Sequence, residues 1–152
     1  MVWVRKSAIA MLAVALAAAA GTGAGCGRAG ITFVSENAEY TLAQVEEVHA
    51  TVAPPPSIAG RSTSDAPELR RDALAVLRGR GGESAELADV LTEILAGADR
   101  SVPYYGEAAT VEGKASWVVL EVWGSEGGTL DNTRLWVFER DGGSVVYSST
   151  RR

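Results

Sequence analysis

The sequence predicts an α+β fold, in which about three helices are followed by a four-stranded antiparallel sheet and pack on one face of it. Two observations support this prediction. Between residues 41 and 95, hydrophobic residues recur at intervals of three and four, as in helices that bury one side. After Arg100 the interval changes to two, which is typical of strands. Consecutive helices followed by consecutive strands are the element order of an α+β domain.

The first predicted elements are a short β-branched run and a helix. Residues 31–34 (Ile-Thr-Phe-Val) are β-branched or aromatic, and residues 35–37 (Ser-Glu-Asn) predict a turn. Thr41 followed by Gln44 has the spacing of a capping box, so we expect a helix to begin there. Its hydrophobic residues have helical spacing and end before Pro54; they are Leu42, Val45, Val48 and Val52.

A proline-rich connection follows this helix. Three prolines at 54–56 cannot continue it, because proline lacks the backbone N–H and favours an extended conformation. With Gly60 and the Ser-Thr-Ser cluster at 62–64, they predict a connection over residues 53–64. Such a long connection is either a mobile segment or a loop that covers part of the domain.

Two further helices are predicted between residues 65 and 95. Asp65, Pro67 and Glu68 favour a helix start, and glycines at 79, 81 and 82 favour its end. Acidic residues at 83, 86 and 89 then suit the first turn of a third helix, where the helix dipole favours negative charge. Its hydrophobic stripe is the clearest in the chain and consists of Leu87, Val90, Leu91, Ile94 and Leu95.

Four strands are predicted in the C-terminal half. They cover residues 101–111, 117–123, 134–140 and 144–149, with tight turns at 112–114 and 141–143. The loop from Gly124 to Asn132 is longer than a hairpin needs. It is either a binding loop beside Trp123 or a flexible connection, which its glycines favour.

The N-terminal segment has the features of an export signal. Arg5 and Lys6 precede 13 apolar residues from Ala8 to Ala20. This run is shorter than the roughly 20 residues that a membrane-spanning helix needs. Small residues then lead to Cys26, the single cysteine of the chain.

This order, ending in Gly23-Ala24-Gly25-Cys26, resembles the signal peptide of bacterial lipoproteins. The resemblance covers residues 1–26 and implies that the thiol of Cys26 receives diacylglycerol and becomes the new N-terminus. Gly23 departs from the family, which usually has an aliphatic residue there. The predicted organisation is a signal peptide at 1–25, a lipidated cysteine and short tether at 26–30, and one α+β domain at 31–152. The alternative is an ordinary secretory peptide cut near Ala20, giving a soluble secreted protein.

Charge and cysteine content exclude several classes of partner. Residues 26–152 keep all 19 acidic side chains but only 12 of the 14 basic ones, because Arg5 and Lys6 precede them. An acidic domain of this kind is not expected to bind nucleic acid, which requires clustered cations. One cysteine cannot form an intrachain disulfide or a cysteine-based zinc site. We therefore expect no metal and no cofactor.

No motif in the chain predicts catalysis. It contains neither a Gly-x-Ser-x-Gly elbow nor a phosphate-binding P-loop. The single histidine, His49, is expected on a solvated helix face rather than in a metal site. Four glutamates lie in or beside predicted strands, so a carboxylate pair of the glycosidase kind is conceivable; they are Glu107, Glu112, Glu121 and Glu139.

Aromatic residues concentrate in the predicted strands and supply a candidate binding surface. Strand alternation places Trp117, Glu121 and Trp123 on one face, and Tyr104 and Tyr105 lie in the preceding strand. An exposed aromatic face with an acid can stack on a sugar, a peptide or another protein. The alternative, which aromatic enrichment in strands favours, is that these rings fill the core.

Three functional hypotheses follow. The first is a lipid-anchored module on the extracytoplasmic face of the cell membrane, which is not an enzyme and binds a ligand or an envelope protein. The second is a carboxylate-dependent hydrolase of envelope polymers. The third is a structural or regulatory envelope module that uses a sheet edge or the proline-rich segment as its contact.

Overall fold

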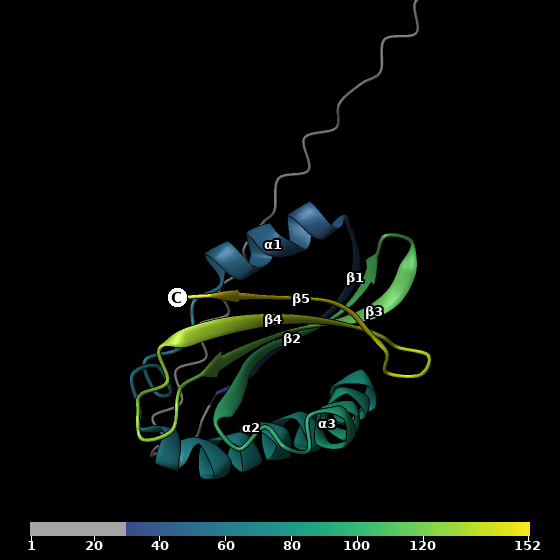
Figure 1. Ribbon diagram of the computed structural model, residues 1–152. Helices are drawn as coiled ribbons and strands as arrows, with labels where there is room; N and C mark the ends of the chain where they lie inside the picture. The colour runs from purple at the N-terminus through teal and green to yellow at the C-terminus, as the bar shows by residue number, and fades with distance from the viewer. Residues whose placement is uncertain (1–29) are drawn as a thin grey trace, which may run out of the picture.

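The computed structural model describes residues 30–152 as a five-stranded sheet with helices on both of its faces (Figure 1). The signal peptide, the lipobox and most of the tether lie outside the described residues. The strands are β1 (Thr32–Tyr40), β2 (Ser101–Val111), β3 (Lys114–Trp123), β4 (Asn132–Glu139) and β5 (Val145–Arg151). The helices are α1 (Leu42–Thr51), α2 (Ala66–Arg80) and α3 (Gly82–Ile94), with a short 3-10 turn, η1 (Thr63–Asp65), before α2.

The sheet is mixed, so the prediction of a four-stranded antiparallel sheet was wrong in one strand. Its order is β1-β2-β3-β4-β5, with β1 parallel to β2 and the other neighbours antiparallel. The turn predicted at residues 35–37 lies inside β1. It forms an irregularity in the pairing between Val34 and Ala38, where Asn37 has a φ of 50°. A bulge accommodates turn-forming residues without ending the strand.

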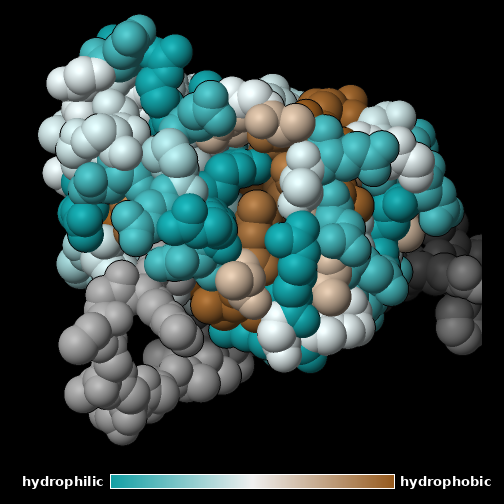
Figure 2. All heavy atoms as spheres, turned by 90° about the horizontal axis from the view of Figure 1, so that it is seen from below, coloured by the Kyte–Doolittle hydropathy of each residue, from teal (hydrophilic) through white to brown (hydrophobic). Residues whose placement is uncertain are grey.

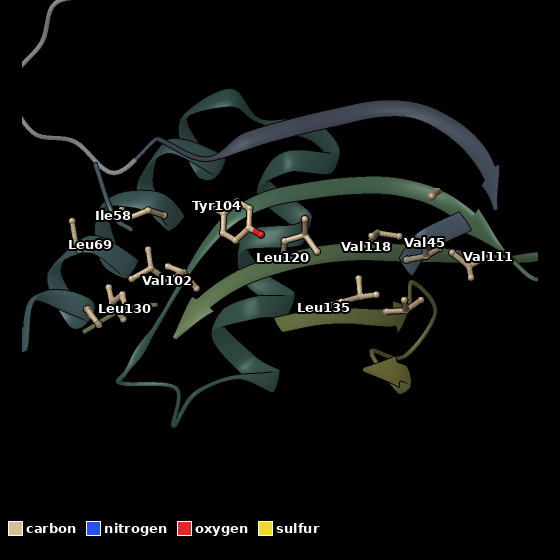
Figure 3. Packing of buried hydrophobic residues seen from close by; sticks show 14 residues of the cluster. Val45, Ile58, Leu69, Val102, Tyr104, Val111, Val118, Leu120, Leu130 and Leu135 are labelled. Atoms are coloured by element: carbon tan, nitrogen blue, oxygen red, sulfur yellow. The ribbon is translucent and has the colours of Figure 1, made fainter. Parts of the chain in front are cut away.

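The prediction that the helices pack on one face was also wrong. On one face, Val45 of α1 joins a core that includes Val118 and Leu120 of β3 (Figure 3). On the other face, Leu77 of α2 and Leu87 of α3 join a second core with β3. Residues from Ser116 to Val122 of β3 are buried on both faces. A strand that is hydrophobic on both faces requires cover on both, and the three helices supply it from two sides.

The helix starts follow local chemistry, as the sequence predicted for α1. The hydroxyl of Thr41 accepts from the N–H of Gln44 at 3.3 Å, and the Gln44 side chain accepts from the N–H of Thr41 at 2.8 Å. This reciprocal pair completes the capping box. Asp65, in contrast, does not cap α2; its carboxylate binds Arg61. Gly79 does not end α2 either, because the helix continues to Arg80 and ends at Gly81, which has a φ of 72°.

The proline-rich connection is a covering loop. Ile58 is fully buried in the core on the same face of the sheet as α1. The N–H of Gly60 donates to the carbonyl of Leu130 at 2.8 Å, and the N–H of Thr63 donates to the carbonyl of Gly128 at 3.0 Å. These bonds join the connection to the loop after β3, so the two segments close one end of the sheet together.

Candidate functional site

The predicted binding surface is divided by the sheet. Trp117, Glu121 and Tyr104 are buried, with 1%, 0% and 2% of their surfaces exposed, and only Trp123 and Tyr105 are half-buried. Trp117 belongs to the core under α2 and α3, whereas both tyrosines belong to the core on the α1 face. An irregularity in β2 between Pro103 and Tyr105 allows the two consecutive tyrosines to face the same core. The five residues therefore do not form one surface.

An arginine stacked on tryptophan marks the part of this set that solvent reaches. The guanidinium carbon of Arg134 lies 4.8 Å from the ring centre of Trp123 and 5.3 Å from that of Trp136. Trp136 in turn stacks on Phe138, with ring centres 5.8 Å apart and planes at 18°. Such contacts hold a guanidinium over the faces of the rings and leave N–H groups at its edge free to donate.

A pocket of about 390 Å³ opens beside this stack. Arg134 and Trp123 line it with Arg100 and Ser125, so that both the loop after α3 and the loop after β3 contribute. The indole Nε1 of Trp123 is buried and has no hydrogen-bond partner within residues 30–152. An unpaired buried N–H costs free energy.

Within residues 30–152, Arg134 has no ion-pair partner, although Glu121 lies opposite it in the register of β3 and β4. Arg140, which directly follows β4, instead pairs with Glu83 at 2.7 Å and Glu86 at 3.4 Å. Arg100, the second cation of the pocket, lies 3.7 Å from the exposed Glu126. Exposed pairs at this distance contribute little. Asp99 and Glu126 also line the pocket, so its two arginines stand beside two carboxylates and the formal charge of the lining is balanced.

Glu121 belongs to a closed structural network. Nη1 of Arg70 donates to its Oε1 at 2.9 Å, and Nη2 of Arg70 donates to the carbonyl of Leu91 at 3.2 Å. The indole N–H of Trp136 donates to the other carboxylate oxygen at 2.8 Å, and the hydroxyl of Ser101 donates to Oε1 at 3.2 Å. This one side chain joins α2, α3, β2, β3 and β4, and no part of it is open to a ligand.

Glu107 forms a second buried carboxyl site, on the α1 face. The hydroxyl of Tyr105 donates to its Oε2 at 2.7 Å, and the hydroxyl of Tyr40 donates to Oε1 at 3.0 Å. Burial raises the pKa of Glu107, while the two tyrosine hydrogen bonds act in the opposite direction and Glu36 adds to the rise. Burial likewise raises the pKa of Tyr40 to about 12.

The two buried glutamates lie on opposite faces of the sheet. Glu107 pairs across β2 and β3 with Val118, which belongs to the core on the α1 face. Glu121 binds Arg70 of α2 on the other face. The remaining glutamates of the predicted set are also engaged, Glu112 with the N–H of Leu42 and Glu139 with Lys114. Glu107 and Glu121 therefore cannot flank one glycosidic bond, which requires carboxyl groups on either side of it.

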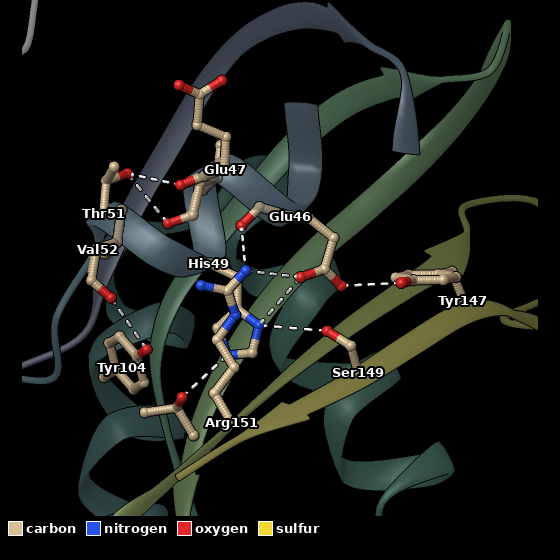
Figure 4. Close-up of polar contacts among 11 residues, drawn as sticks. Glu46, Glu47, His49, Thr51, Val52, Tyr104, Tyr147, Ser149 and Arg151 are labelled. Carbon is tan, nitrogen blue, oxygen red and sulfur yellow. Dashed lines mark hydrogen bonds and ion pairs between the residues drawn. The ribbon is translucent and has the colours of Figure 1, made fainter. Parts of the chain in front are cut away.

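His49 is buried, and the expectation of a solvated position was wrong. Its Nε2 lies 2.9 Å from the hydroxyl of Thr133 on β4, and its Nδ1 lies 3.3 Å from the hydroxyl of Ser149 on β5 (Figure 4). Burial lowers the pKa of His49 and thus favours the neutral imidazole. The helical pattern counted His49 as polar, but its ring satisfies two hydroxyls that the sheet brings beneath α1.

A carboxylate completes this cluster. Glu46 accepts from the hydroxyl of Tyr147 at 2.9 Å and from the guanidinium of Arg151 at 3.0 Å, and it lies 3.9 Å from Nδ1 of His49 (Figure 4). Hydroxyl, imidazole and carboxylate are thus together, yet the side chain of His49 has no exposed surface. The cluster therefore attaches α1 to β4 and β5, and a substrate could not reach the imidazole of His49.

Two properties were also tested for the described residues. Between residues 30 and 152, no helix combines the length and the hydrophobicity required to cross a bilayer. In the same part of the chain, no three His, Cys, Asp or Glu side chains are grouped so as to hold a metal ion.

The predicted binding surface did not include Arg134 and Trp136, the residues that complete the stack. The signal was present in the strand at 132–139, where Arg134, Trp136 and Phe138 alternate with smaller residues and therefore share a face. The register of β3 and β4, which brings Arg134 opposite Glu121 and near Trp123, could not be read from either strand alone.

The chain was compared with protein-family models, with curated proteins and with solved structures, and no match was found in any of the three.

Proposed function

We propose that this protein is a lipid-anchored module of the bacterial cell envelope that binds a small anionic ligand in the pocket of Trp123 and Arg134. It acts by binding rather than by catalysis. The proposal combines the first hypothesis drawn from the sequence, a lipid-anchored binding module, with the pocket found in the structure. The tether rests on the resemblance of residues 1–26 to lipoprotein signals, and the ligand class rests on the chemistry of the pocket.

The observation that carries the ligand class is the guanidinium of Arg134, which stacks on two tryptophans and has no ion-pair partner among the described residues. A guanidinium presents N–H groups in a planar fork that matches a carboxylate or a phosphate. Trp123 and Trp136 restrict its orientation, so less entropy is lost when a ligand binds. The ring of Trp123 supplies apolar area beside the charge. A planar molecule with one anionic group fits this combination.

Replacing Arg134 with glutamine should abolish or strongly weaken anion binding. Hydrogen bonds to charged groups contribute about 1.5–3 kcal/mol, which corresponds to roughly a 10- to 100-fold loss of affinity. Isothermal titration with benzoate, phenyl phosphate and neutral benzamide measures this directly. We expect wild-type protein to bind one or both anions and to bind benzamide much more weakly.

Arg71→Gln is the matched control, because it removes the same charge from an exposed position on α2 whose partner, Glu68, lies 3.9 Å away. It should bind as the wild type does. Equal affinity of Arg134→Gln and wild type, or a preference of the wild type for benzamide, would contradict the proposed ligand class.

The tether has its own test. Mass spectrometry of membrane-extracted protein should show an acylated N-terminal residue that corresponds to Cys26. Cys26→Ser should leave the chain unacylated and change its fractionation, without altering anion binding by the domain. An unmodified chain that starts near Gly21 in the soluble fraction would refute the anchor and leave the ligand proposal standing.

A further inference from the structure

Among the described residues, β5 is an edge strand with one side open. Within residues 30–152 it pairs only with β4, through a register that runs from Thr133 opposite Arg151 to Phe138 opposite Val145. Within residues 30–152, the large hydrophobic side chains that stand exposed are Val145 at 49% and Val146 at 44%, and both begin this strand. An edge strand presents unpaired backbone N–H and C=O groups, which can pair with another strand.

From Tyr147 to Thr150, this edge has none of the charges, prolines or bulges that usually prevent such pairing. Residues 144–150 (Ser-Val-Val-Tyr-Ser-Ser-Thr) include no charged residue and no proline. The other edge, β1, differs because it carries Glu36 and Glu39 and is interrupted by the bulge at Asn37. Charges and bulges are common protections of a sheet edge. The single irregularity of β5 is at Val146 and leaves the register from Tyr147 to Arg151 unbroken.

The strand is held firmly from the side of α1. Tyr147, Ser149 and Arg151 alternate along β5 and contact Glu46 or His49 of α1. The intervening Ser148 and Thr150 lie on the opposite face and are exposed. Seen from the side of α2 and α3, the molecule is mostly hydrophilic, with hydrophobic residues confined to a narrow strip and a few patches (Figure 2). A strand fixed by one face and open at its edge is a ready template for a further strand.

We propose that β5 pairs in antiparallel orientation with β5 of a second copy of this chain, so that one sheet continues through a two-fold dimer. The distribution of charge along the strand favours a second copy of the chain as the partner. Asp141 precedes the strand, Arg151 ends it and Arg152 follows, while the residues between 144 and 150 are neutral. Antiparallel self-pairing brings the acidic end of each strand toward the basic end of the other, whereas parallel pairing would bring like charges together.

Self-association elsewhere is opposed by the net charge of −5, so the neutral edge is the favoured meeting point. A two-fold contact also uses the same patch on both copies, as most homodimers do. The dimer is independent of the ligand pocket and of lipidation, and it can be tested whether or not these proposals hold.

Single cysteines introduced along the edge test the pairing in the full chain. Val146→Cys, Ser148→Cys and Thr150→Cys are each oxidised with copper phenanthroline and compared with wild type, whose only cysteine is Cys26. We expect at least one variant to form a reducible species of twice the chain mass, and the wild type to form none at that intensity. Glu36→Cys, on the edge of β1, is the matched control and should not crosslink.

A second measurement distinguishes a stable dimer from crosslinks that form through chance collisions. Sedimentation in density-matched detergent should give a dimer for the wild type and a monomer for Val146→Lys, with unchanged circular dichroism showing that the domain remains folded. The proposal is overturned if all three edge cysteines crosslink no better than Glu36→Cys, or if wild type and Val146→Lys sediment alike. Crosslinks of another mass, to a different protein, would also overturn the choice of a second copy.

Discussion

Replacing Glu121 with glutamine is expected to lower the free energy of unfolding by about 3–5 kcal/mol, the usual cost of removing one partner of a buried ion pair. Arg70 would keep its charge while only 11% of its side chain is exposed. It would retain the carbonyl of Leu91 as an acceptor but lose the carboxylate 2.9 Å away. Urea unfolding followed by circular dichroism at neutral pH measures the difference.

The same substitution at Glu107 is the matched control, and the opposite result is expected there. Glutamine can accept from one tyrosine through its Oε1 and donate through its Nε2 to the hydroxyl oxygen of the other, and it carries no charge that burial would penalise. Because burial raises the pKa of Glu107 above its unfolded value, its stabilisation is present at low pH and is lost as the pH rises through the folded pKa. Glu107→Gln should remove this loss, so its advantage over wild type should grow from pH 4 to pH 8.

Comparing the two variants distinguishes a buried charge that the fold requires, at Glu121, from one that it only tolerates, at Glu107. Equal destabilisation by Glu121→Gln and Glu107→Gln at neutral pH would show that the Arg70 pair has no special role. A wild-type stability that rises steadily over the range in which Glu107 titrates, with Glu107→Gln following the same course, would contradict the assigned direction of its pKa.

Trp117→Ala is the second change with a large expected effect, also about 3–5 kcal/mol of lost stability. Trp117 is 1% exposed, and its ring centre lies 6.4 Å from that of Phe33 on β1. The guanidinium carbon of Arg140 stacks on the same ring, 4.3 Å from its centre. Truncation would leave a cavity between the sheet and α3 and would remove the surface on which Arg140 rests. Denaturant unfolding checks the loss.

Two variants test whether this loss comes from packing. Trp117→Phe keeps a ring and should cost clearly less than alanine. Trp123→Ala, in the same strand but half-buried, should change the unfolding free energy less and should weaken anion binding instead. Equal stability losses for Trp117→Ala and Trp123→Ala would refute the assignment of one residue to the core and the other to the pocket.

The local elements were largely predictable because their signals are local. The capping box at Thr41, the hydrophobic stripe of α3 and the alternation in β2 to β5 each depend on neighbours within a few residues, and each element formed where predicted. β1 was the exception. Its β-branched start was recognised, but the turn-forming residues at 35–37 are held in a strand by pairing with β2, some 70 residues later.

The candidate site was less predictable, since its formation depends on the register of the strands and on which side chains the helices bury. Trp117 and Trp123 share a face by alternation, yet α2 and α3 bury the first, while the second lies at a strand end beside two loops. Likewise, the glutamate spacing in β2 and β3 does not reveal that the carboxyls of Glu107 and Glu121 lie on opposite sides of the sheet. Arg134 became a candidate site residue only because the pairing of β3 with β4 brings its guanidinium onto Trp123.

By itself, the sequence determined the α+β class, most of the helices and strands, the acidic charge, and the expectation that Cys26 anchors the chain. These depend on residue type and short-range spacing, which a linear chain displays directly. The tertiary structure decided which aromatic rings are buried, which carboxyls are paired, and which arginine stacks on tryptophan beside a pocket. Those outcomes depend on contacts between residues far apart in the chain, because burial and pairing are properties of the surroundings and not of the side chain alone.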